Sequence, residues 1–545
     1  MRKLSTLAGC AVAAGSVVAA VLTATPTMAA GAAESGTDTV AQDVAASVAW
    51  TPCNPSSTDP TAPVCGYLSV PLDHDKPNGT KIKLALSMVK HTVTADKYQG
   101  IMLVNPGGPG GSGLGLSVLG KYVPNGAGDA YDWIGFDPRG VGSSVPSLTC
   151  IADYSKGPRP EYVPLTPSLE KTWLARSKAY AEACGKNGGE LLKHMRTTDV
   201  AQDMESIRAA MRVKQINFYG FSYGTYLGQV YSTLFPSKVR RMVLDSNVDP
   251  TRVFYQANLD QDIAFERNMK IWWKWVADYD AVYHLGKTEA AVERNWYLEK
   301  ERLRAKPAGG VVGADEWTDI FLGAGYYQVT WLELAQVWAD WTSNHDPAPV
   351  VAEYESSDSP TDDNGFAVYN AVQCTDAPWP KSWDTWKRDN WSTFTKAPYE
   401  TWGNAWFNAP CLYWPAKAGP AVDVDGSKVA PILLIDETLD AATPYGGSLE
   451  VRKRFPKSSL IAEPGGTSHA DSLFGNACVD DQIAAYLADG TLPKRKPGSG
   501  ADTTCDPLPV PVPTAATGSA SGLAAQASAT SRAATLGRLL HFGRE

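Results

Sequence analysis

One serine stands between two glycines directly after a short apolar run, in the stretch INFYGFSYGT at residues 216–225. The first five residues favour a β-strand, and residues 223–235 favour a helix. Glycines two positions before and after Ser222 permit a turn too tight for side chains at those positions. The pattern therefore predicts a nucleophile elbow, in which a strand, a sharp turn and a helix expose the serine hydroxyl. The Tyr223 amide opens the helix and can stabilise a developing oxyanion.

Strand and helix patterns alternate through the first half of the chain. Strand-like runs lie at residues 81–90, 100–113, 131–144 and 239–246, and a helical pattern lies at 197–211. The second and third of these runs continue into glycine-rich loops. Strands that alternate with helices predict an α/β fold with a mostly parallel sheet.

The pattern changes after residue 250, where long helical stretches rich in tryptophan begin. Of the 18 tryptophans, 15 lie between Trp272 and Trp414. A buried strand pattern returns at 430–444. We therefore expect one α/β core, interrupted by a helical cap that is inserted before this returning strand. The expected bounds are 49–250 for the first part of the core, 251–425 for the cap and 426–505 for the second part of the core.

The two ends of the chain have their own compositions. Residues 1–30 combine a basic start, a long apolar run and small residues, as in a signal peptide. The segment LAGC, which ends at Cys10, could instead be a lipidation site, but most of the apolar run follows this cysteine and favours cleavage. Residues 31–48 resemble a flexible leader or pro-segment, and 506–545 a low-complexity tail. We expect a secreted, extracellular protein without stable membrane insertion.

The charge of the chain argues against nucleic-acid partners, and its cysteine content predicts disulfides. The net charge is −9, so the chain lacks the basic footprint of a nucleic-acid-binding protein. Loss of Cys10 with the signal would leave eight cysteines of nine, an even number that suggests disulfides in an exported protein. No C-x-x-C pair is present, and we expect no metal, no cofactor and a monomer. Short separations favour neighbouring pairs: Cys53–Cys65, Cys150–Cys184, Cys374–Cys411 and Cys478–Cys505.

A serine nucleophile needs a base, and in this kind of fold the acid and then the histidine follow the serine along the chain. His284 and His345 lie within the inserted cap, before the sheet resumes. His541 lies in the low-complexity tail. His469 follows a last strand-like run in a glycine-rich loop, EPGGTSHADS, and is therefore the expected base.

The acid should lie at the end of the strand that precedes this histidine. Asp436, Glu437 and Asp440 all follow the apolar run there, and Asp245 ends an earlier strand. From these residues alone, Asp436 and Asp440 are equally good candidates for the acid. The glycine-rich loop NPGGPGGSG at 105–113 is the expected source of a second oxyanion amide.

Many segments together resemble the secreted tripeptidyl aminopeptidases of actinobacteria, a family of α/β-hydrolase serine peptidases that includes the proline iminopeptidases. The resemblance covers about residues 60–505. It is carried by NPGGPGGSG, IGFDPRGVGSS, INFYGFSYGTYLGQVY, VLDSNVDP, AVQCTDAPWP, LDAATPYGGSLEVRKRF, GGTSHADS and CVDDQIAAYLADGTLP.

The resemblance implies an α/β-hydrolase fold and selects among the candidates. It favours Asp440, in the LD-x-x-TP element, as the acid, and it supports His469 as the base. It also implies that Gly108 is the second oxyanion donor beside Tyr223, because PGGPG corresponds to HGGPG in the family. Pro106 stands here where the iminopeptidases have histidine.

The expected activity is a serine exopeptidase that releases short N-terminal peptides, chiefly tripeptides, through an acyl-enzyme on Ser222. Its substrates would be peptides with a free N-terminus, whose ammonium a cap carboxylate would bind. Asp376, in CTDAPWP, is a candidate for that carboxylate, and capping of a turn is its alternative role. Alternative activities are a carboxylesterase or lipase with the same triad, and a proline iminopeptidase-like aminopeptidase.

Overall fold

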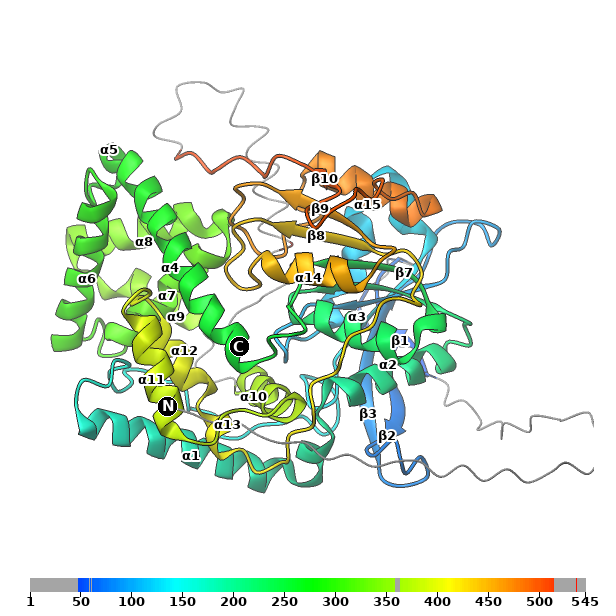
Figure 1. Cartoon of the computed structure of the whole chain (residues 1–545), viewed down its shortest axis with the longest axis horizontal. Helices are drawn as coiled ribbons and strands as arrows, with labels where there is room; N and C mark the ends of the chain where they lie inside the picture. Colours follow the sequence, from blue (N-terminus) through cyan, green and yellow to red (C-terminus); the bar gives the residue numbers. More distant parts are fainter. Residues whose placement is uncertain (1–47, 58, 60, 358–362, 514–535, 537–545) are drawn as a thin grey trace, which may run out of the picture. The chain divides into compact units, whose positions relative to one another are not determined.

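The computed structural model describes residues 48–57, 59, 61–357, 363–513 and 536 (Figure 1). All of them belong to one compact unit of the chain. The expected signal peptide, most of the expected leader and most of the expected tail lie outside the described residues. Within the described part, no helix combines the length and apolarity needed to cross a membrane.

The described residues form a ten-stranded sheet in the order β1-β2-β3-β5-β4-β6-β7-β8-β9-β10. The first three pairings in this order, from β1 to β5, are antiparallel, and the remaining pairings are parallel. The mostly parallel sheet is thus confirmed. The strands are β1 (Thr51–Pro52), β2 (Val64–Pro71), β3 (Lys81–Val89), β4 (Ile101–Asn105), β5 (Asp132–Phe136), β6 (Ile216–Phe221), β7 (Val239–Asp245), β8 (Leu433–Glu437), β9 (Ser459–Glu463) and β10 (Thr503–Thr504).

Side chains of the central strands enter two separate cores, one on each face of the sheet. In β4, Ile101 and Leu103 pack with one apolar cluster, whereas Met102 and Val104 pack with another. This alternation follows from the two-residue period of a strand, and it explains why the central strands are apolar throughout. Helices α1 (Pro167–Gly188), α2 (Thr197–Ala210), α3 (Tyr223–Leu234) and α14 (Gly446–Arg454) contribute to the first cluster, and α15 (Ala477–Asp489) contributes to the second.

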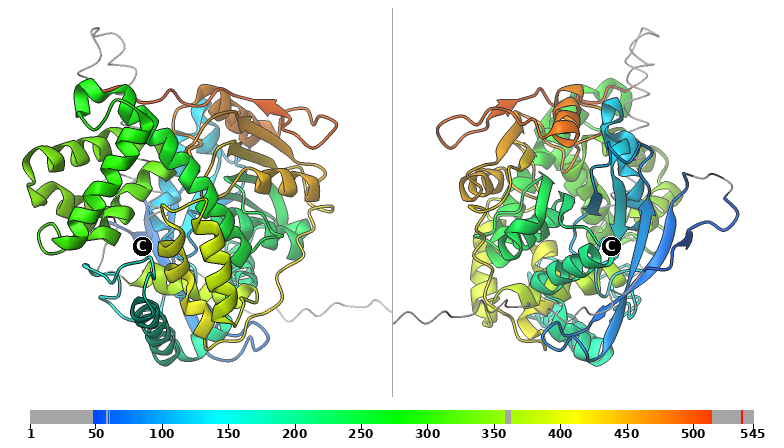
Figure 2. Two further views of the ribbon diagram at one scale, coloured as in Figure 1. Left: turned by 60° about the vertical axis from the view of Figure 1, so that its left-hand side comes forward. Right: turned by 90° about the vertical axis from the view of Figure 1, so that its right-hand side faces the viewer.

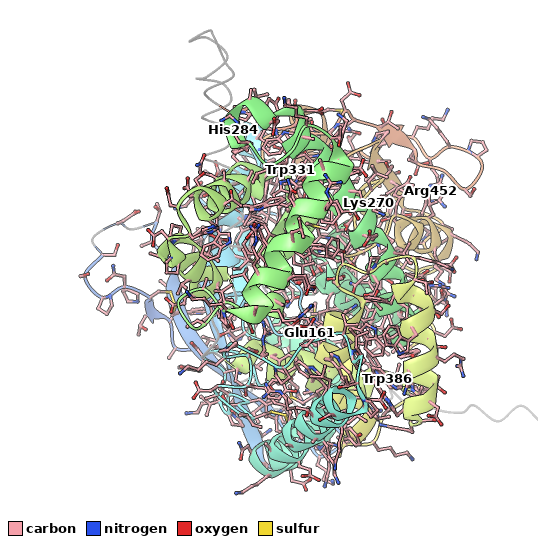
Figure 3. All side chains as sticks on the ribbon, turned by 90° about the vertical axis from the view of Figure 1, so that its left-hand side faces the viewer. Glu161, Lys270, His284, Trp331, Trp386 and Arg452 are labelled. Atoms are coloured by element: carbon pink, nitrogen blue, oxygen red, sulfur yellow. A yellow bond between two sulfur atoms is a disulfide. The ribbon has the colours of Figure 1, made fainter. Side chains whose placement is uncertain are left out.

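The inserted region is helical, as expected, and much of it has a core of its own. Trp272, Trp273, Trp296, Trp317 and Trp338 are fully buried together in this core, which explains the local tryptophan bias. Figure 1 shows α4 between the other helices of this group and strands β7 to β9, and Figure 3 shows Trp331 among these helices. The helices are α4 (Tyr255–Asp278), α5 (Asp280–Tyr283), α6 (Glu289–Ala305), α7 (Ala314–Tyr326), α8 (Trp331–Asn344) and α9 (Pro347–Ser357).

The second half of the inserted region packs differently. Its helices are α10 (Asn364–Asp376), α11 (Trp383–Phe394), α12 (Thr401–Asn408) and α13 (Pro410–Tyr413). Phe366 and Trp386 belong to the same apolar cluster as the strands, whereas Trp402 and Trp406 pack against Trp173 of α1. These helices and α1 lie side by side in Figures 1 and 2. We therefore treat 251–357 as the part of the cap that supplies most of this separate core, to which Tyr399, Ala441 and Ala442 also contribute.

Four disulfides occur among the described residues, and they join the neighbouring cysteines that the sequence suggested. The bonds link residues 12 to 37 positions apart. Closing loops of this length restricts the unfolded chain and stabilises the fold, by about 3 kcal/mol for a 15-residue loop. The pairs are Cys53–Cys65, Cys150–Cys184, Cys374–Cys411 and Cys478–Cys505.

Candidate active site

Ser222 occupies a strained turn between β6 and α3. Its backbone has φ +55° and ψ −128°, a conformation that costs about 1–3 kcal/mol in a residue other than glycine. Two neighbours hold it there: the Ser222 N–H donates to the Asp245 carbonyl of β7 at 3.0 Å, and the Ser222 carbonyl accepts the N–H of Thr225 at 2.8 Å. The turn therefore has the strand, strained serine and helix that the motif predicts.

The two glycines of the elbow avoid clashes with different neighbouring atoms. A Cβ atom on Gly220 would lie 2.5 Å from the Gly224 carbonyl oxygen, so the tight turn itself excludes a side chain there. A Cβ atom on Gly224 would instead lie 2.6 Å from the carbonyl oxygen of Asn105, at the end of β4. The second glycine is thus required because α3 starts directly against the neighbouring strand.

The glycine-rich loop after β4 lies against the serine. A Cβ atom on Gly107 would come within 2.8 Å of the Ser222 Cβ atom, and both Gly107 and Gly108 have positive φ angles, of 110° and 99°. Gly108, Ser222 and Tyr223 line the same cavity. The loop and the start of α3 therefore bring backbone of the two expected oxyanion donors to the serine from different segments of the chain.

His469 and Asp440 form a buried pair in the loops that follow β9 and β8. The His469 Nδ1 atom lies 2.8 Å from Asp440 Oδ2, and both side chains are almost fully excluded from solvent. The Asp440 carboxylate also accepts the N–H of Thr443 at 3.0 Å and its hydroxyl at 2.9 Å. These bonds fix the carboxylate, and a proton on Nδ1 leaves the lone pair on Nε2 for base catalysis.

The other acids that the sequence offered do different things. Asp436 accepts a hydrogen bond from the Ser448 hydroxyl of α14 at 2.5 Å. Asp245 accepts the backbone N–H of Ser472 at 3.0 Å, and Glu437 accepts the N–H of Ser468. Among these residues it is thus Asp440 that contacts the histidine ring, while Asp245 and Glu437 support the histidine loop from the ends of two strands.

Buried carboxyl groups surround the histidine loop. Burial, and then the charge of Asp471, raises the pKa of Glu437 well above its usual range. The same causes raise the pKa of Asp245 to about 7, and burial raises that of Asp471 to about 6. One oxygen each of Glu437, Glu463 and Asp471 lies within 4.8 Å of the others, the arrangement of a possible metal site. The raised pKa values also mean that these groups can share protons with one another.

Glu463 gives this cluster a measurable pH dependence. Burial, with the charges of Asp471 and Asp245, raises its pKa from 4.5 to about 10. The folded protein therefore keeps this proton over a pH range in which the unfolded chain has lost it, so stability falls as pH rises through this range. The Asn476 side-chain amide donates to Glu463 Oε2 at 2.6 Å, and a glutamine there can still accept this bond. Glu463→Gln should therefore show a smaller fall in Tm than wild type between pH 5 and pH 9.

The matched control for this change is Glu355→Gln, at an exposed position on α9. Its Tm should follow the wild-type pH dependence. Thermal denaturation of the three proteins at a series of pH values makes the comparison. Parallel curves for Glu463→Gln and wild type would show that Glu463 is already ionised in the folded protein at neutral pH.

A cavity of about 250 Å³ opens beside Ser222. Part of its wall comes from the segment after β7 and from the start of α4, including Phe254, Asn258 and Asp260. The remaining wall includes Gln373 of α10 and, beside the acid, residues 442–444, 446 and 447. The serine therefore lies at the junction of the core and the inserted helices.

Asp376 bonds to helix α2 and lies away from the cavity. The Thr197 N–H donates to its Oδ1 atom at 2.7 Å, and the Thr197 hydroxyl donates to Oδ2. The carboxylate therefore caps α2, and Asp376 is absent from the described residues that line the cavity. Asp260 of α4 does line it, with its carboxylate paired to Arg252 at 2.9 Å. No sequence pattern singles out Asp260, because many acids of the cap have similar neighbours along the chain.

A serine at a strand–helix elbow, and a buried His–Asp pair on later loops of a mostly parallel sheet, define an α/β hydrolase of the serine type. Family models agree: the alpha/beta hydrolase fold matches residues 100–304, and the TAP-like protein family matches 397–505. The chain belongs to the tripeptidyl aminopeptidase family, as its sequence segments had indicated.

Three relatives illustrate this membership. Tripeptidyl aminopeptidase of Streptomyces lividans is 42% identical, over 85% of this chain and 87% of the relative. Serine protease Hip1 of Mycobacterium tuberculosis is 30% identical, over 82% of this chain and 89% of the relative. Carboxylesterase B of Mycobacterium tuberculosis is 29% identical, over 79% of this chain and 85% of the relative.

Proposed function

We propose that the protein is an exported serine exopeptidase that releases short peptides, chiefly tripeptides, from free N-termini. The observation that carries this proposal is the buried His469–Asp440 pair, at 2.8 Å, on a fold whose elbow serine lines a small cavity under a helical cap. The similarity to a tripeptidyl aminopeptidase supports the length of the released peptide. The basic and apolar N-terminal segment and the disulfides support export of the enzyme.

The proposed chemistry gives these groups the roles they have in serine hydrolases with a Ser-His-Asp triad. Asp440 holds the His469 ring by its Nδ1–H, and Nε2 takes the proton of the Ser222 hydroxyl. The serine oxygen attacks the scissile carbonyl, and the amides of Tyr223 and Gly108 stabilise the oxyanion. His469 then protonates the leaving amine. Water, activated by the same histidine, releases the peptide from the serine ester.

The cavity wall suits a short N-terminal segment. Val248, Phe254 and Ala257 give it an apolar side, and Asp260 gives it a carboxylate on the cap. An N-terminal ammonium could join the Arg252–Asp260 pair as a second cation on that carboxylate. Because the inserted helices cover this region, a folded protein would not reach the serine with an internal peptide bond. Asp260 is therefore our candidate for the group that selects free N-termini.

Acetylation of the substrate amine tests this selection. An N-acetylated tripeptide anilide should lose about one to two decades of kcat/KM relative to the free tripeptide anilide, because Asp260 is 32% exposed and a hydrogen bond to a charged group is worth about 1.5–3 kcal/mol. In Asp260→Asn, the free peptide should lose most of its advantage over the acetylated peptide. Rates are compared at one pH near 7, with aminoacyl and dipeptidyl anilides and a short-chain ester alongside.

The matched control is Asp278→Asn, on the same helix but exposed and paired with Lys274. It should keep the wild-type preference for free amines. Equal rates on free and acetylated peptides, with fast ester hydrolysis, would favour the carboxylesterase alternative. Fastest release of a single residue would favour a proline iminopeptidase-like activity. If Asp260→Asn kept the full preference for free amines, the proposed exopeptidase activity would stand, but a group other than Asp260 would bind the amine.

A further inference from the structure

Helix α4 of the cap contacts the loop that carries the proposed acid. The Gln261 side-chain amide donates to the Ala442 carbonyl at 2.5 Å. The Arg267 guanidinium donates to the carbonyls of Leu439 and Asp440. Backbone on both sides of the Asp440 carboxylate is therefore tied to one helix of the cap.

Asn268, the next residue on α4, contacts three segments of the chain. Its side chain is 1% exposed, and its Nδ2 atom lies 3.0 Å from the carbonyl oxygen of Leu439, 3.1 Å from that of Gly325 and 3.2 Å from that of Thr467. These carbonyls belong to three different segments. They are the acid loop after β8, the end of α7 and the histidine loop after β9.

Each of these carbonyls lies close in sequence to a group that holds the acid–base pair. Leu439 precedes Asp440 directly, and Thr467 is two residues before His469. Gly325 directly precedes Tyr326, whose carbonyl accepts the backbone N–H of His469 at 2.9 Å. One amide thus bridges the supports of both the acid and the base.

The bonding around Asn268 fixes which way its amide faces. The Arg267 Nε–H donates to Asn268 Oδ1 at 3.0 Å, so the NH₂ group faces the carbonyls. The two hydrogens of this group serve three acceptors, so at least one bond is shared. A side chain without a donor would leave carbonyl oxygens facing one another in a buried site, which the loops would relieve by moving apart.

We propose that Asn268 is a positioning residue for catalysis: it couples the cap to the distance between Asp440 and His469. The inference rests on the proposed triad. Loss of the amide should let the two loops shift, and a shift of about 1 Å in a catalytic group is enough to cost on the order of 10²-fold in rate. Asn258 and Asp260 of the cavity wall lie two to three turns earlier on α4, so this part of the wall should keep its contacts with the substrate.

The test compares Asn268→Ala with Asn390→Ala. Asn390 is also a buried asparagine on a cap helix, but its side-chain amide donates to the Trp386 carbonyl of its own helix. We expect kcat on the free tripeptide anilide to fall about 10²-fold in Asn268→Ala, with KM within about threefold of wild type. Asn390→Ala should keep wild-type kcat. Titration with a fluorophosphonate counts active sites, so that an inactive fraction is not mistaken for a lower kcat.

A second variant covers the case in which Asn268→Ala does not fold. Arg267→Met removes the donor that orients the Asn268 amide, together with the bonds to the acid loop, from a half-buried position. It should also lower kcat more than it changes KM. Asp440→Asn in the same assay tests the triad separately from the positioning role of Asn268. If Asp440→Asn is inactive but Asn268→Ala keeps near-wild-type kcat, the positioning role is overturned. If only Arg267→Met folds, a near-wild-type kcat in that variant has the same meaning. An active Asp440→Asn overturns the triad, and the positioning role with it.

Discussion

Replacing Ser222 with alanine lowers kcat on the order of 10⁶-fold and leaves the protein folded, because the attacking oxygen is gone while the smaller side chain fits the elbow. The backbone around position 222 is held by the Asp245 carbonyl and the Thr225 N–H, which do not involve the serine hydroxyl. The measurement is kcat on a free tripeptide anilide, together with Tm. A variant that kept a tenth or more of wild-type kcat would rule out Ser222 as the nucleophile.

A buried serine of α3 provides the control for this change. Ser232 is fully buried, and its hydroxyl donates to the Gln229 carbonyl of the same helix at 3.0 Å. Ser232→Ala should retain wild-type kcat even if its Tm falls. A loss of activity in both variants would point to disturbed packing of α3 rather than to a missing nucleophile.

Asp440→Asn should lower kcat by about 10⁴-fold. The carboxylate accepts the Nδ1–H of His469 at 2.8 Å, whereas an asparagine can present its NH₂ group to that nitrogen and favour the wrong tautomer. Thr443 would still bond an amide oxygen, so the loop should keep its fold. The rate on the tripeptide anilide, with Tm as the check on folding, measures the effect.

Asp436→Asn is the matched control, four residues earlier. Burial, and then the charge of Asp440, raises the pKa of Asp436 well above its usual range, which favours the neutral form of its side chain. A neutral amide can replace it with a mild effect on kcat. A mild Asp440→Asn together with a severe Asp436→Asn would show that the acid was assigned to the wrong residue.

The elbow could be predicted from the sequence because most of its requirements are local. The clash at Gly220 arises within the turn, between residues four apart, and a strand–turn–helix pattern is enough to expect it. The clash at Gly224 involves Asn105 on another strand. A contact between residues so far apart in the chain depends on strand order, which local patterns do not contain.

The acid and the amine-binding group show where local patterns stop. Asp436 lies in β8 and Asp440 follows the same strand. What distinguishes them is the residue that each contacts: Ser448 for Asp436 and His469 for Asp440. Asp376 and Asp260 are both cap acids. The first caps α2 through Thr197 and the second lines the cavity, and this depends on how the inserted helices pack.

The tryptophan bias predicted an inserted helical region but not its division. Residues up to 357 form most of a separate core, whereas Phe366 and Trp386 join the core of the sheet, and Trp406 packs on α1. Both halves are helical and rich in aromatic residues, so composition alone does not distinguish them. The partners of each apolar face are fixed only in the folded chain.

The central claim is that this enzyme removes tripeptides from free N-termini through Ser222. Mass spectrometry of an unblocked decapeptide, incubated with wild type and with Ser222→Ala, measures this directly. The account predicts successive losses of three residues from the N-terminus with wild type, and an intact peptide with the variant. Single-residue losses, internal fragments, or the same products with both proteins would contradict it.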